Sequence, residues 1–108
     1  MKYLKKKKMY EISRLFIQNK IDELSFLTDC EFTKCVHSYY SFNRGYERLE
    51  FGIYDNTNDI MYVLHFSSFN GCFWFRIYKQ AEDSINDKEI YYFVCDLSEL
   101  EQILGKEV

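Results

Sequence analysis

Six side chains of this sequence are of the two types, cysteine and histidine, that most often bind metals or serve nucleophilic catalysis. They are Cys30, Cys35, His37, His65, Cys72 and Cys95. Structural zinc sites usually place two ligands about two to four residues apart in a turn, twice over, whereas Cys35 and His37 alternate along a stretch with strand character. The spacing therefore predicts no metal site, and we expect no cofactor.

Nucleophilic catalysis would require a cysteine or serine beside a positioned base. The sequence contains no strand-turn-helix nucleophile elbow, no glycine-rich phosphate loop and no metalloprotease helix motif. It therefore predicts a protein that is not an enzyme. The alternative from the enzyme class is a small metal-dependent enzyme that uses His65 with nearby cysteines or carboxylates.

Charge is distributed unevenly along the chain. The net charge is -3, yet residues 1–20 carry +6 and residues 81–108 carry -6. Nucleic-acid affinity comes mostly from clustered Lys and Arg, so an acidic body argues against direct binding of nucleic acid. The four lysines Lys5 to Lys8 could attract phosphate or an acidic protein, although such a run is also typical of a solvated helix start.

The compartment is predicted from the same composition. The basic start of the chain is followed by an amphipathic segment and not by the apolar stretch of a secretory signal. No apolar run approaches the roughly 18 residues of a membrane span. We expect a cytoplasmic protein of a bacterial host cell, without membrane insertion and with reduced thiols.

The elements that must position any site form one domain over residues 1–108. Helical spacing of Met9, Ile12 and Phe16 predicts a helix over about residues 8–19, with a shorter helical piece near 20–27. Asp96 followed by Glu99 predicts a capped C-terminal helix that Gly105 ends. The predicted fold class is α+β, an antiparallel meander of about five strands flanked by an N-terminal and a C-terminal helix.

Period-two alternation predicts the strands between these helices. They cover residues 32–40, 47–54, 60–66, 72–79 and 89–95. Residues 55–59 favour a turn, because Asn and Asp side chains hydrogen-bond to their own backbone. They should close a hairpin.

Alternation also divides the strand side chains between two faces, and both faces are rich in apolar residues. The predicted core face holds Leu49, Phe51, Ile53, Leu64, Phe66, Phe73, Phe75, Ile77 and Val94. The opposite face holds Tyr54, Met61, Val63, His65, Trp74, Arg76, Tyr78, Tyr91 and Phe93. Either each helix covers one face, which gives three layers, or a partner or a second copy of the chain covers the second face.

The second face has the mixture of Trp, Tyr, Met and Arg that is enriched at binding hot spots. Its predicted partner-binding residues are Trp74, Arg76, Tyr78, Tyr54, Tyr91 and Phe93. We expect a small non-enzymatic protein-binding inhibitor, encoded by a phage or mobile element and directed at a host defence protein, an anti-CRISPR-like role. Small size, a composition typical of AT-rich coding and this face motivate the expectation. A structural homodimer that buries the face against itself is the alternative.

The acidic residues between 82 and 101 also indicate what kind of partner to expect. Opposite charges attract, so these acids could meet a basic groove that normally holds nucleic acid on a nucleic-acid-binding host protein.

Overall fold

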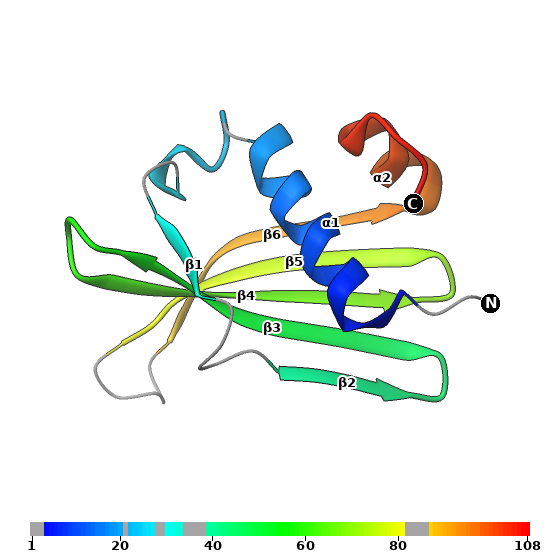
Figure 1. The fold of residues 1–108 in the computed structure, drawn as a ribbon, viewed down its shortest axis with the longest axis horizontal. Coiled ribbons are helices and arrows are strands. Elements are labelled where there is room, and N and C mark those ends of the chain that lie inside the picture. The colour runs from blue at the N-terminus through cyan, green and yellow to red at the C-terminus, as the bar shows by residue number, and fades with distance from the viewer. Residues whose placement is uncertain (1–3, 21, 28–29, 34–38, 82–86) are drawn as a thin grey trace.

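The computed structural model describes residues 4–20, 22–27, 30–33, 39–81 and 87–108, and for residues 31–33 it describes the backbone. Its elements are α1 (Lys5–Asn19), the 3-10 turn η1 (Ser25–Leu27), β1 (Glu31–Thr33), β2 (Tyr39–Asn43), β3 (Tyr46–Asp55), β4 (Ile60–Phe69), β5 (Cys72–Lys79), β6 (Lys88–Asp96) and α2 (Leu97–Leu104). The described strands form one antiparallel sheet between an N-terminal and a C-terminal helix (Figure 1). The predicted α+β meander is confirmed.

One edge of the sheet differs from the prediction. β3, β4, β5 and β6 pair in chain order, while β1 and β2 both pair with β3. β1 lies beside residues 52–54 and β2 beside residues 46–50 of that strand. The single strand predicted over residues 32–40 is therefore two short strands placed end to end along one edge, and residues 34–38 lie outside the described part of the chain.

The predicted turns and caps follow from local side-chain chemistry. The Asp55 carboxylate accepts the backbone N–H groups of Thr57 at 3.0 Å and Asn58 at 3.2 Å, which closes the hairpin between β3 and β4. At the other end of the chain, the Asp96 carboxylate accepts the Glu99 N–H at 2.8 Å. α2 then ends at Gly105, whose φ of 71° is left-handed. Both local predictions are confirmed.

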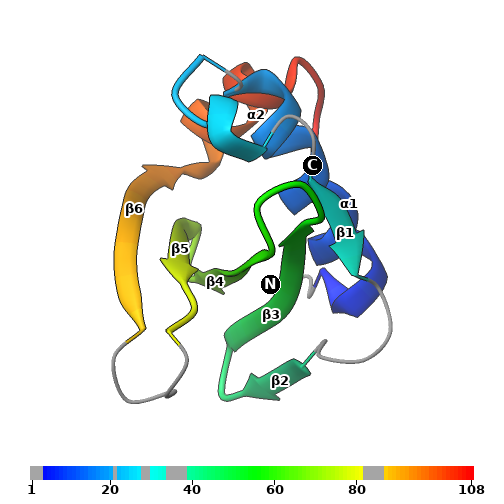
Figure 2. The ribbon, with the colours of Figure 1, turned by 90° about the vertical axis from the view of Figure 1, so that its left-hand side faces the viewer.

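Both helices lie on the same face of the sheet (Figures 1 and 2). α1 buries Met9, Ile12 and Phe16, and the Phe16 ring stacks on the Phe75 ring of β5 with 3.8 Å between centroids. α2 follows β6 without a loop and buries Leu100 and Leu104 in the same core. The three-layer arrangement is therefore wrong: among the described elements, two helices and one sheet make two layers.

The helix-covered face contains the predicted core with one correction. Its fully buried side chains include Leu49, Phe51, Ile53, Leu64, Phe66, Phe75 and Ile77, and Phe73 is 4% exposed. Val94, predicted on this face, is 43% exposed. In β6, Cys95 lies opposite Phe73, Phe93 opposite Phe75 and Tyr91 opposite Ile77, so these three residues of β6 face the helices.

Glu47 of β3 joins the sheet to the start of α1. Its carboxylate accepts the backbone N–H of Leu4 at 2.7 Å and of Lys5 at 3.1 Å, and also the Tyr40 hydroxyl at 2.9 Å. The residue is 3% exposed, so these three donors replace water around a buried acid. Burial and the neighbouring Glu47 raise the pKa of Tyr40 to about 12, which keeps its hydroxyl a donor.

Candidate functional site: the open face of the sheet

The open face is the face of the sheet opposite α1 and α2, and none of the described helices lies over it (Figure 2). It carries the side chains of Tyr46, Arg48, Glu50, Tyr54, Met61, Val63, His65, Ser67, Trp74, Arg76, Tyr78, Tyr92 and Val94. Strand alternation puts them there, because each is the neighbour in sequence of a residue that faces the core.

Trp74, Arg76 and Tyr78 lie on the open face as predicted. They alternate along β5 with the buried residues Phe73, Phe75 and Ile77, which lie beneath the helices. Tyr54 also lies on this face, but at the end of β3, where its hydroxyl donates to Asp59 in the hairpin turn. The structure therefore brings the three β5 residues together and leaves Tyr54 apart from them.

Tyr91 and Phe93 do not lie on the open face, and their predicted placement is wrong. The Tyr91 hydroxyl donates to Glu23 at 3.0 Å, and the Phe93 ring lies 5.4 Å from the Phe16 ring of α1. Burial, reinforced by Glu23, raises the pKa of Tyr91. Alternation alone could not show which residues of β6 face the core, because odd and even positions of this strand are equally apolar.

Tyr92 and Val94 occupy the open face in their place, at 48% and 43% exposure. Their position follows from Cys95, which is buried opposite Phe73. Cysteine is among the most buried residue types, so assigning Cys95 to the core would have given the correct phase of the strand.

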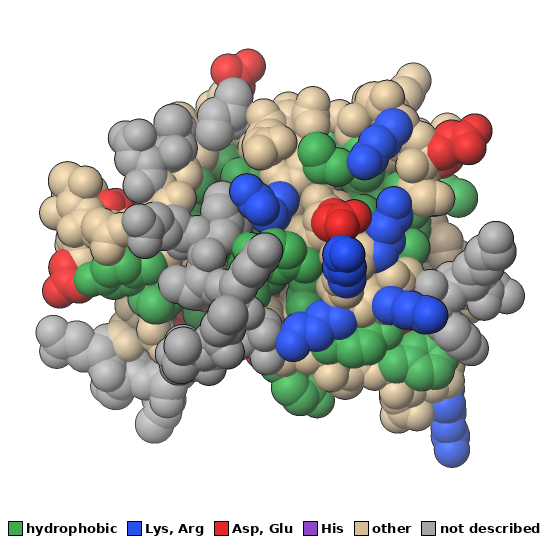
Figure 3. All heavy atoms as spheres, viewed as in Figure 1, with side chains coloured by type: hydrophobic (Ala, Val, Ile, Leu, Met, Phe, Trp, Pro, Cys, Tyr) green, Lys and Arg blue, Asp and Glu red, His purple; other side chains and the backbone are tan. Residues whose placement is uncertain are grey.

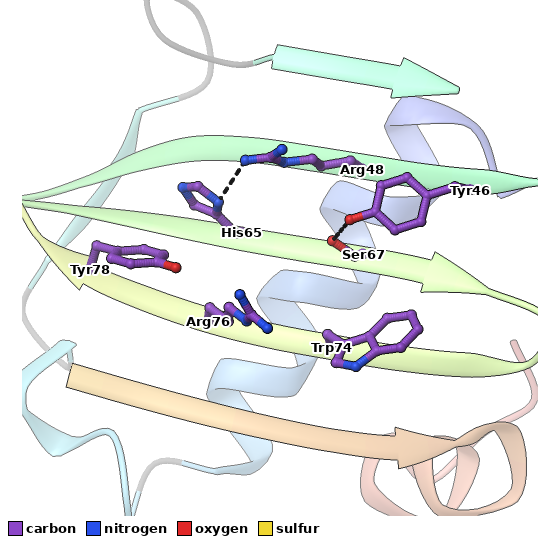
Figure 4. A pocket seen from close by; sticks show the side chains of 7 residues that line it. All are labelled: Tyr46, Arg48, His65, Ser67, Trp74, Arg76 and Tyr78. Carbon is purple, nitrogen blue, oxygen red and sulfur yellow. Dashed lines mark hydrogen bonds between the residues drawn. The ribbon is translucent and has the colours of Figure 1, made fainter. Parts of the chain in front are cut away.

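The centre of the open face is hollowed (Figure 4). We call the central hollow the depression of about 420 Å³ that is lined by Tyr46, Arg48, His65, Ser67, Trp74, Arg76 and Tyr78. A second depression of about 440 Å³ adjoins it and shares Arg48, His65 and Tyr78. Volumes of this size hold a small molecule or a few side chains of a protein partner.

Arg48 is held at the hollow by contacts across two strands. Its Nη2 pairs with Glu50 Oε1 and lies 3.2 Å from His65 Nδ1. The same carboxylate oxygen lies 3.5 Å from His65 Nδ1. Burial lowers the pKa of His65; Glu50 opposes this shift, and Arg48 and Arg76 add to it. The imidazole is therefore neutral at pH 7 and hydrogen-bonds as a neutral ring.

Arg76 is held from the opposite side by β6. Its Nε lies 3.7 Å from Glu89 Oε1, and its guanidinium stands 5.0 Å from the centroid of the Tyr92 ring. The Tyr78 ring lies 4.7 Å from the His65 ring. Because the Arg76 and Glu89 side chains are 46% and 43% exposed, this ion pair positions the guanidinium without contributing more than about 1 kcal/mol to stability.

The described cysteines and acids do not form a metal site. Within the described ranges, no group of three His, Cys, Asp or Glu side chains is placed to hold a metal ion. Cys95 is a free thiol on the helix side, and burial raises its pKa to about 11. Cys35 and His37 lie outside the described residues.

The helix side of the molecule carries the basic residues of α1 (Figure 3). Lys5, Lys6, Lys7 and Arg14 are exposed there, with Glu11 among them. None of the described helices has the length and apolar character needed to cross a bilayer.

No protein-family model, curated protein or solved structure matches the chain.

Proposed function

We propose that this protein is a small non-enzymatic binding module that docks on another protein through the open face. The observation that supports the proposal is the set of aromatic and arginine side chains on a face without a described covering helix. Trp, Tyr and Arg are the residue types that dominate binding energy at protein interfaces, most of all where they surround a recess.

Exposure of apolar surface supports the same proposal. Tyr46 on β3 is 39% exposed, and Tyr92 and Val94 on β6 are 48% and 43% exposed, so exposed apolar side chains lie on both sides of the central hollow. Exposed aromatic side chains around the centre of a surface are typical of protein interfaces.

The finer form of the proposal is an inhibitor of a host defence protein, carried by a phage or mobile element. Its motivation is the small size and the AT-rich type of composition, with few Gly and no Pro among 108 residues. The described acids Glu89 and Asp96 lie exposed on β6, the edge strand of the open face, and Glu99 lies exposed on α2. They would meet a basic groove of the partner, and association should then slow as salt screens the charges.

The direct test is capture of a partner from a bacterial host lysate, followed by binding measurements with two variants. Trp74→Ala should weaken binding by about 2 kcal/mol or more, as expected of a central aromatic anchor. Phe26→Ala is the matched control, because Phe26 is a 38% exposed aromatic residue on η1, on the helix side. Equal binding by the parent and Trp74→Ala would contradict docking through this face.

A homodimer that buries the open face against itself is the competing proposal. Light scattering after size exclusion, over a dilution series, separates the two. A stable dimer that Trp74→Ala dissociates would favour the homodimer over docking on another protein.

A further inference from the structure

Two arginines and a neutral histidine meet at the central hollow, one from each of three adjacent strands. Arg48 comes from β3, His65 from β4 and Arg76 from β5, and Glu50, His65 and Arg76 are direct cross-strand neighbours. Figure 4 shows Arg48 and Arg76 on opposite sides of the recess, with His65 and Ser67 of β4 between them.

Each guanidinium keeps donors available to a ligand. Both close contacts of Arg48 are made by Nη2. Arg76 pairs with Glu89 through Nε at 3.7 Å and also hydrogen-bonds the side chains of Tyr78 and Tyr92, so three of its partners are known. A guanidinium has five N–H donors in a planar fork that matches the two oxygens of a carboxylate. The flanking contacts therefore orient the two forks and do not saturate them.

Two walls of the hollow suit an apolar or aromatic group attached to the anion. Trp74 and Tyr78 lie on either side of Arg76 along β5, and Tyr46 closes the far end, where its hydroxyl donates to Ser67 Oγ at 3.0 Å. These rings are half-buried or exposed, so they offer flat surface beside the charges.

We propose that the central hollow receives a carboxylate of the docked protein, held between Arg48, His65 and Arg76, with the adjoining apolar group against Trp74 and Tyr78. The proposal rests on the proposed docking function and names the chemistry of the partner that fits. The occupant is an aspartate, a glutamate or a chain end that lies next to an aromatic or aliphatic side chain.

The charges around the hollow are balanced, which favours a singly charged over a doubly charged anion. Glu50 pairs with Arg48 and Glu89 pairs with Arg76, so the four side chains together carry no net charge. A carboxylate can bind the guanidinium donors that Glu50 and Glu89 leave available. A phosphate, with close to two negative charges at pH 7, costs more to desolvate, and this balanced set of charges offers it no additional net attraction.

Small probes test this preference without knowledge of the partner. Benzoate, benzamide and phenyl phosphate share one ring and differ in charge. The chain has one tryptophan, so the indole N–H signal in an NMR spectrum reports on the hollow without ambiguity. Benzoate should shift this signal in a saturable way, and benzamide and phenyl phosphate should bind more weakly.

Arginine variants locate the site of the probe. Arg48→Gln and Arg76→Gln should each weaken benzoate binding about tenfold or more, because each loses a charged hydrogen-bond donor. Arg44→Gln is the matched control, since Arg44 is exposed in the turn between β2 and β3 and lies outside the hollow. Its benzoate affinity should equal that of the parent.

Two outcomes would overturn the proposal. One is no saturable shift with benzoate, and the other is equal or tighter binding of phenyl phosphate. Either leaves docking itself to be decided by the Trp74→Ala comparison with a captured partner, so failure of the carboxylate site and failure of the docking function give different results.

Discussion

The side chains of β5 alternate between the two faces of the sheet, and the two rows differ in kind. Phe73, Phe75 and Ile77 lack polar side-chain atoms and pack under the helices, whereas Trp74, Arg76 and Tyr78 each carry a hydrogen-bonding group and line the central hollow. Both rows are rich in apolar surface. A polar group on a large side chain, more than hydrophobicity, therefore distinguishes the row on the open face from the row in the core.

The largest expected effect comes from the covered face. Phe75 stacks on Phe16 at 3.8 Å and on Phe66 at 4.3 Å between ring centroids, and it is fully buried. Phe75→Ala should lower the free energy of unfolding by about 3–5 kcal/mol, through lost burial and a cavity. Urea denaturation measures this, with Phe75→Leu as a milder variant that keeps most of the volume. A loss below about 1 kcal/mol would contradict the core position.

Two glutamates of β3, one on each face of the sheet, allow the contribution of a carboxylate to stability to be compared between the faces. Glu47→Ala should cost about 2–3 kcal/mol, because two backbone N–H groups and the Tyr40 hydroxyl lose a charged acceptor. Glu50→Ala removes a carboxylate that is 24% exposed on the open face and should cost less than about 1 kcal/mol. Denaturant midpoints of the two variants measured side by side check this order. Equal losses would show that burial of Glu47 does not strengthen its hydrogen bonds.

A smaller effect is expected at Trp74. With no described helix above it, Trp74→Ala leaves no enclosed cavity and should change the free energy of unfolding by at most about 1 kcal/mol. Thermal melting of this variant beside Phe75→Ala gives the sharpest contrast between neighbouring residues of one strand. A melting temperature as low as that of Phe75→Ala would mean that the open face is covered within the chain.

The smallest expected effect is the pH dependence of the open face. Burial lowers the pKa of His65 below 6.5 in the folded state, so the unfolded chain takes up this proton first. Stability from the neutral ring is complete above pH 6.5 and is lost as the pH falls through the lower folded pKa. The parent should therefore lose more stability than His65→Gln between about pH 7 and pH 5 in denaturant titrations. Parallel curves for the two proteins would show that folding does not lower the pKa of His65.

Local chemistry made part of this structure predictable from the sequence. The Asp55 turn and the Asp96 cap each use partners within three residues, so the sequence alone determines them. The phase of β6 was not determined, because both of its rows are apolar and only the buried Cys95 separates them. The candidate site was predicted in its β5 residues, which alternate clearly with buried phenylalanines.

Arg48 was missed as a site residue, for a physical reason. Its place in the hollow depends on the register that brings β3 beside β4, where Arg48 and His65 are 17 residues apart in sequence. The sequence left open whether the two helices cover one face or both, for the same kind of reason, since this depends on where α2 packs after β6 ends. Contacts of this range are not encoded in any short pattern.

The buried acid Glu47 also bears on the order of folding. It is 43 residues from Leu4 in the sequence, so the first turn of α1 gains its acceptor only after β3 has been placed. A terminal helix that must wait for a distant strand raises the contact order of the chain, and such chains fold more slowly than chains with local contacts. During synthesis, the lysine-rich start of α1 would remain frayed until the central hairpin had left the ribosome.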